Sequence, residues 1–232
     1  MGEDRLEDLM ADRAPLYYRS PQKIAEMLRD GHFKSAFVET VARLPISEHF
    51  RNSHFGEILS GVFAQEVLGW RLLYSKLRLN TAENSNPHKM DLLFLDPDGS
   101  VPTLILGEVK SSMKSGVPAG HDVSCYPSLF DSLREYSELD LQYDLTAARD
   151  HLDDLPLDER RLARQALLPY SGSPIMYAGF VVVDTDTRSD SETSMLATRK
   201  SEKQFDIDLV CVENLAEVCA ATYGLLKAMR DV

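Results

Sequence analysis

The stretch that decides the fold is residues 89–112, KMDLLFLDPDGSVPTLILGEVKSS. It contains two apolar runs, residues 92–95 and 103–106, separated by Asp-Pro-Asp-Gly at 96–99. Two runs of strand length joined by turn-forming residues predict a β-hairpin. Working outward from this hairpin, the chain reads as an α/β protein with a mixed central sheet flanked by helices.

Ionisable side chains lie at the ends of both runs. Asp91 opens the first run, and Glu108 and Lys110 close the second. Side chains alternate between faces along a strand, so Glu108 and Lys110 point to one side and Val109 to the other. Hard divalent cations prefer carboxylate and carbonyl oxygens, which makes Asp91, Glu108 and the carbonyl of Val109 candidate ligands for Mg²⁺ or Mn²⁺. With Lys110 orienting a water or neutralising charge, the pattern favours metal-assisted phosphodiester hydrolysis.

The alternative is a surface hairpin whose acids and lysine form an ordinary salt bridge. An Asp followed by Glu-x-Lys at loose spacing arises often by chance. Both acids, however, adjoin apolar runs that read as buried, and buried strands rarely end in ionisable clusters without a functional reason. We therefore favour the catalytic interpretation.

The rest of the chain supplies helices and further strands. Residues 1–20 mix charges with few apolar positions and suggest a loose arm. Apolar periodicity, caps and turn residues predict helices at 22–29, 51–68, 129–139, 143–152, 157–168 and 215–229, and strands at 70–79, 175–183 and 205–212. We expect an N-terminal helical region, 1–48, followed by the main domain, 49–232.

Glu57 lies on the predicted helix at 51–68, roughly opposite its apolar stripe. The small neighbours Gly61 and Ala64 would let another element approach this acid. The competing interpretation is an acid on a solvated helix surface, which is the commoner situation. The residues alone leave both open.

Charge limits what the chain can do by itself. There are 37 Asp and Glu against 25 Lys and Arg, a formal net charge of −12. This opposes nonspecific attraction to nucleic acid, so DNA contacts must be local or assisted. The acidic start lacks a signal-peptide layout, and no apolar run reaches membrane-spanning length, which predicts a cytoplasmic protein without membrane contact. The sequence does not determine the oligomeric state.

The order of the expected elements resembles the core of the PD-(D/E)xK nuclease superfamily. A helix comes first, three strands that carry Asp and then Glu-x-Lys follow, and a helix and a further strand come last. Three segments resemble the HamA proteins of the two-component Hachiman antiviral system. They are HFGEIL at 54–59, KLRL at 76–79 with His88 and Asp-Leu-Leu at 91–93, and GEVK at 107–110.

The resemblance implies a restriction-endonuclease-like core and a metal-dependent nuclease effector. It would degrade DNA on phage infection beside a helicase partner, HamB. Asp91 and Glu108 match the metal-binding acids, Lys110 the catalytic lysine, and Glu57 the acid often found on the first core helix, so Glu57 becomes a candidate catalytic residue and metal ligand. Met90 stands where the motif name has proline, which carries no chemistry. Candidate nucleic-acid contacts are Lys76, Arg78, His88, Lys89, Ser111, Ser112 and Lys114.

Two other functions compete with this one. A nuclease-like fold that serves only as a binding module has no physical need for Asp91, Glu108 and Lys110 together. A self-contained restriction-type endonuclease would need its own recognition surface, and no separate basic domain is visible in the sequence.

Overall fold

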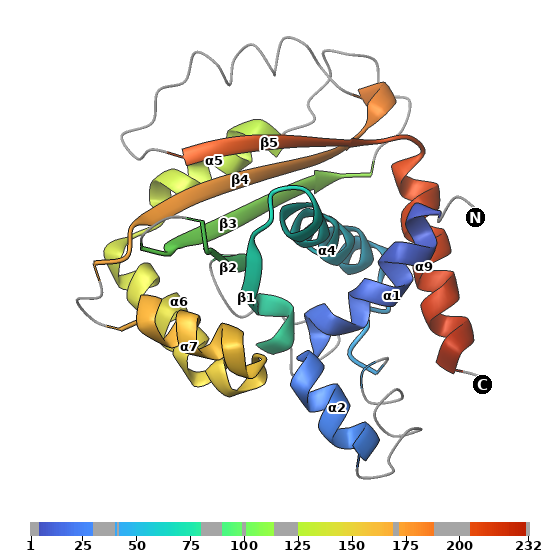
Figure 1. The fold of residues 1–232 in the computed structure, drawn as a ribbon. Coiled ribbons are helices and arrows are strands. Elements are labelled where there is room, and N and C mark those ends of the chain that lie inside the picture. Colours follow the sequence, from blue (N-terminus) through green and yellow to red (C-terminus); the bar gives the residue numbers. More distant parts are fainter. Residues whose placement is uncertain are drawn as a thin grey trace.

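The computed structural model describes residues 5–29, 40, 42–79, 90–98, 101–113, 125–168, 172–187 and 205–230. The predicted His88, Lys89 and Lys114 contacts lie outside these residues. Figure 1 shows one mixed sheet with helices on both of its faces.

The sheet has five strands in the order of the sequence. They are β1 (Arg71–Ser75), β2 (Leu92–Asp96), β3 (Thr103–Ser112), β4 (Ile175–Asp184) and β5 (Phe205–Val212). The β1–β2 and β2–β3 pairs are antiparallel, whereas β3, β4 and β5 are mutually parallel. The predicted hairpin is confirmed, with Leu92 opposite Gly107 and Asp96 opposite Thr103.

Helices cover both faces of this sheet (Figure 1). On one face lie α1 (Leu6–Tyr18), α4 (Glu48–Glu66) and α9 (Leu215–Arg230), and on the other α5 (Cys125–Glu135), α6 (Glu138–Asp150) and α7 (Leu157–Ala166). The remaining described elements are α2 (Pro21–Arg29) and the short 3₁₀ helices η1 (Lys76–Leu79), η2 (Leu152–Asp154) and η3 (Thr185–Thr187). Among the described residues, no helix has both the length and the apolarity needed to cross a bilayer.

Strand alternation divides the apolar residues between two cores. Leu92 and Phe94 of β2 pack on the α4 side, whereas Leu93 and Leu95 pack on the α5 side. A sheet buried on both faces has strands that read as continuous apolar runs, which is what the sequence shows. The result is a three-layer α/β/α arrangement with β3 near its centre.

Two expectations about local structure are wrong. Residues 6–18 are not a loose arm but the helix α1, whose Met10, Ala14 and Tyr18 are buried in the core shared with α4 and α9. The strand expected at 70–79 ends at Ser75, and the chain then turns into η1. This turn aims the Lys76 side chain differently from the continuous strand that the sequence suggested.

Candidate active site at the edge of β3

The site lies where β2 begins and β3 continues past it. Because the β2–β3 pairing starts at Leu92 opposite Gly107, residues Glu108 to Ser112 of β3 extend beyond their neighbour. Asp91 stands at this point, and its backbone N–H donates to the carbonyl of Gly107 at 3.1 Å. The hairpin therefore places an acid beside the free edge of β3.

The backbone of Val109 faces this acid. Its N–H donates to Asp91 Oδ2 at 2.6 Å. In an extended strand the N–H and C=O of one residue point toward the same neighbouring strand, so the Val109 carbonyl also faces the free edge. Both backbone groups of Val109 are thus directed to the place where the sequence predicts a metal ligand.

Glu108 and Lys110 occupy one face of β3, as alternation predicts. Val109 packs in the α4-side core, and Lys110 Nζ donates to Glu108 Oε1 at 2.7 Å. Lys110 is the more accessible of the two, with 28% of its side chain exposed. It is therefore available to a molecule entering from outside.

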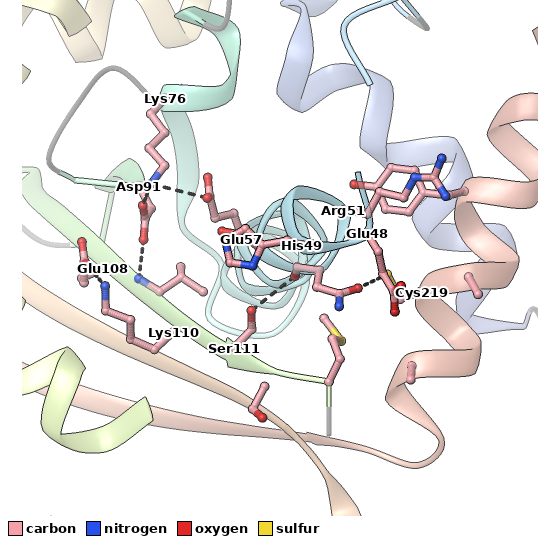
Figure 2. A pocket seen from close by; sticks show the side chains of 18 residues that line it. Glu48, His49, Arg51, Glu57, Lys76, Asp91, Glu108, Lys110, Ser111 and Cys219 are labelled. Carbon is pink, nitrogen blue, oxygen red and sulfur yellow. Dashed lines mark hydrogen bonds and ion pairs between the residues drawn. The ribbon is translucent and has the colours of Figure 1, made fainter. Parts of the chain in front are cut away.

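Glu57 reaches the same cluster from α4. It is not a solvated helix acid, because only 2% of its surface is exposed. Lys76 Nζ lies 3.4 Å from Glu57 Oε1 and also forms an ion pair with Asp91 Oδ1. Among the described residues the second oxygen, Glu57 Oε2, has no hydrogen-bond partner. Figure 2 shows Glu57, Asp91 and Glu108 gathered around these contacts.

Burial shifts the ionisation of the cluster. It raises the pKa of Glu57 to about 8, against the lowering effect of Lys76. Burial, with Asp91 nearby, also raises the pKa of Glu108 to about 7. For Lys76 burial acts in the opposite direction, but the carboxylates of Asp91 and Glu57 outweigh it and hold its pKa above the ordinary value. Clustered carboxyls with raised pKa values are typical of functional sites.

The cluster opens into a cavity of about 860 Å³ between α4, β3 and α9. Its lining includes the three acids and two lysines together with other side chains of α4, β3 and α9, among them His49, Arg51, Ser111, Ser112, Cys219 and Tyr223. The structure thus brings together Asp91, Glu108, Lys110, Glu57 and Val109.

Among the described residues, some of the candidate nucleic-acid contacts line the cavity, and others do not. Ser111 and Ser112 line the cavity, and Ser111 Oγ donates to the carbonyl of Asn52 at 3.3 Å. Arg78 is nearly buried and donates to the carbonyls of Leu16 and Leu73, so it holds α1 against η1. Phosphate contacts by these side chains stay predictions.

Sequence reasoning missed several residues of the site and its supports. His49 and Arg51, in the first turn of α4, line the cavity, and their proximity to a predicted helix start was the only available signal. Asp184, the last residue of β4, is buried and accepts a hydrogen bond from the backbone N–H of Leu215 at 2.8 Å. It therefore anchors the beginning of α9, which forms one wall of the cavity.

A divalent cation would find suitable donors here. The carboxylates of Asp91, Glu108 and Glu57, whose Oε2 has no partner among the described residues, and the Val109 carbonyl form the oxygen-rich set that Mg²⁺ or Mn²⁺ prefers. No group of three or more His, Cys, Asp or Glu side chains in the described part of the chain is arranged closely enough to hold an ion as it stands. These oxygen donors suit a divalent cation, but the ammonium groups of two lysines already pair with the carboxylates.

A mixed five-stranded sheet flanked by helices, with Asp91 and Glu108-x-Lys110 at the free edge of a central strand, defines an α/β protein of the restriction-endonuclease-like class. The HamA family model matches residues 2–222, and the chain therefore belongs to the HamA family. Family and fold support a nuclease effector.

Two further comparisons accompany this one. The structure titled "restriction endonuclease FokI bound to DNA" is similar at 10% identity with a TM-score of 0.29, covering 99% of this chain. This chain spans 33% of that chain, and so low a TM-score supports no argument. No curated protein matches.

Proposed function

We propose that this protein is a metal-dependent nuclease that hydrolyses DNA phosphodiester bonds as the effector of an antiviral defence system. The single observation that carries the proposal is the buried cluster of Glu57, Asp91 and Glu108, beside Lys110 and open to a cavity. A merely structural ion pair would not require three carboxylates converging on a free strand edge.

The acids and the lysine of the site have separate roles in the proposed reaction. Asp91, Glu108, Glu57 and the Val109 carbonyl would hold Mg²⁺ or Mn²⁺, which would stabilise charge on the phosphate and lower the pKa of a water. Lys110 turns from Glu108 toward the substrate, where it orients the attacking water and offsets the developing negative charge. Its partial exposure supports this role.

The substrate needs help to reach the site. A chain of net charge −12 has poor long-range attraction to DNA. A HamB-like helicase would deliver strands to the cavity and restrain cleavage until infection. Local contacts would come from Ser111 and Ser112, with His49 and Arg51, which also line the cavity.

The test is a cleavage assay on plasmid and linear DNA with Mg²⁺ or Mn²⁺, with and without the helicase. Lys110→Ala is expected to lower the cleavage rate by about 100-fold or more, because the group that meets the developing charge is lost. Lys23→Ala is the matched control, since Lys23 is an exposed lysine on α2 that pairs with Glu26 at 3.9 Å.

The outcomes separate the competing functions. Cleavage that survives Lys110→Ala or Glu108→Ala would refute the site. Binding of DNA without cleavage under any of these conditions would favour a binding module. Cleavage by the chain alone at one sequence would favour a restriction-type endonuclease.

A further inference from the structure

Lys76 occupies an unusual place for a residue expected to contact phosphate. Only 6% of it is exposed, and its backbone N–H donates to the carbonyl of Asp91 at 3.0 Å. Its ammonium lies between two carboxylates, paired with Asp91 Oδ1 and 3.4 Å from Glu57 Oε1. Figure 2 shows the side chain descending from η1 to these two acids.

The acids need this positive charge when no metal is present. Buried carboxylates are strongly unfavourable unless they are paired or hydrogen-bonded. Lys76 serves Asp91 and Glu57, while Lys110 serves Glu108. Each of the three acids thus has a lysine ammonium group as a close partner.

The same contacts stand in the way of a divalent cation. Asp91 Oδ1 and Glu57 Oε1 are oxygens that a metal would use, and both face the lysine ammonium. A divalent ion placed among these oxygens would be repelled by an ammonium a few ångströms away in a poorly solvated site.

We propose that Lys76 is a built-in counter-cation of the acid cluster, which must leave Asp91 and Glu57 before a divalent cation binds there. The inference rests on the proposed metal-dependent function. It assigns Lys76 to the metal-free state of the site rather than to DNA.

The cavity offers space into which the Lys76 side chain can move. Lys76 lines the same 860 Å³ space as the acids. A lysine carries its charge on a flexible four-carbon stem, so the ammonium can turn into this space without a backbone change. Once there it would be more accessible than in the metal-free protein.

The first test is Mn²⁺ affinity, measured by calorimetry or by the electron paramagnetic resonance of free Mn²⁺. Lys76→Met keeps the apolar stem and removes the charge. It is expected to bind Mn²⁺ at least about tenfold more tightly than the unmodified chain, whereas Lys76→Arg, which keeps the charge, is not. Lys110→Met is the matched control for removing one positive charge from the cluster, and its gain should be smaller.

A second measurement uses the unmodified chain and does not depend on any variant folding. Brief acetylation followed by mass spectrometry should find Lys76 protected in EDTA and more reactive when Mn²⁺ is bound. Lys23, with 58% of its side chain exposed, should react equally in both conditions.

The results distinguish this inference from the proposed function. Mn²⁺ binding that is unchanged or weaker in Lys76→Met, or Lys76 protection that persists with Mn²⁺ bound, would overturn the counter-cation role and leave a metal-dependent nuclease intact. If none of the proteins binds Mn²⁺, both fail. A Lys76→Met chain that folds only with Mn²⁺ would support the inference, because the ion then replaces the lysine charge.

Discussion

At Gly56, α4 packs closely against Ser111 of β3. A Cβ atom added to it would lie 2.5 Å from Ser111 Cβ and 2.6 Å from Ser111 Oγ. Ordinary contacts fall at 3.4 to 4 Å. Ser111 Cβ is fixed to the β3 backbone, so rotating a side chain does not relieve the clash. In Gly56→Ala, α4 must therefore move away from β3 by about 1 Å.

The expected cost has two parts. Overpacking of this kind destabilises a core by about 1–3 kcal/mol, offset by up to about 1 kcal/mol because alanine favours a helix over glycine. We expect a net loss of about 1–2 kcal/mol. Glu57 is the next residue, and misplacing a site residue by about 1 Å can lower activity by about 100-fold. Activity should thus fall much further than stability.

The assay combines urea unfolding with DNA cleavage. Gly224→Ala is the matched control, because Gly224 lies in α9 with nothing within 4 Å of an added Cβ. It should gain up to about 1 kcal/mol and keep its activity. Gly56→Ala combined with Ser111→Gly removes the clashing atoms and should recover much of the lost stability. A Gly56→Ala chain as stable and active as Gly224→Ala would refute the close packing of α4 on β3.

Two further predictions concern ionisation and capping. The pKa of Glu57 in the folded state, about 8, lies above its ordinary value of 4.5, so the folded protein keeps a proton that the unfolded chain has released. Stability in EDTA should therefore fall as pH rises between these values. Glu57→Gln should flatten this slope in urea titrations, and an equal slope in both proteins would contradict the assignment. Asp184→Ala removes the acceptor for the Leu215 N–H and should lower the free energy of unfolding by about 1–2 kcal/mol, whereas an unchanged melting temperature would rule out this capping role.

Much of the fold follows from local patterns. The strand at 175–183 and the antiparallel pairing of the strands on either side of the predicted turn are confirmed because apolar runs and turn residues act through neighbouring positions. The helix α1 shows the limit of such reading. Its buried residues Met10, Ala11, Ala14, Tyr17 and Tyr18 do recur at helical spacing, but the charges between them and Pro15 obscured the pattern.

The sequence alone determined the order of strands and helices and the shared side of Glu108 and Lys110, because periodicity and alternation are properties of adjacent residues. Only the tertiary structure decided that Glu57 is buried, that Lys76 pairs with Asp91 and Glu57, and that both lie in one cavity with β3. The turn from β1 into η1 and the close approach of α4 at Gly56 bring these residues together. Interactions between charges depend on distance through space, which sequence spacing does not give.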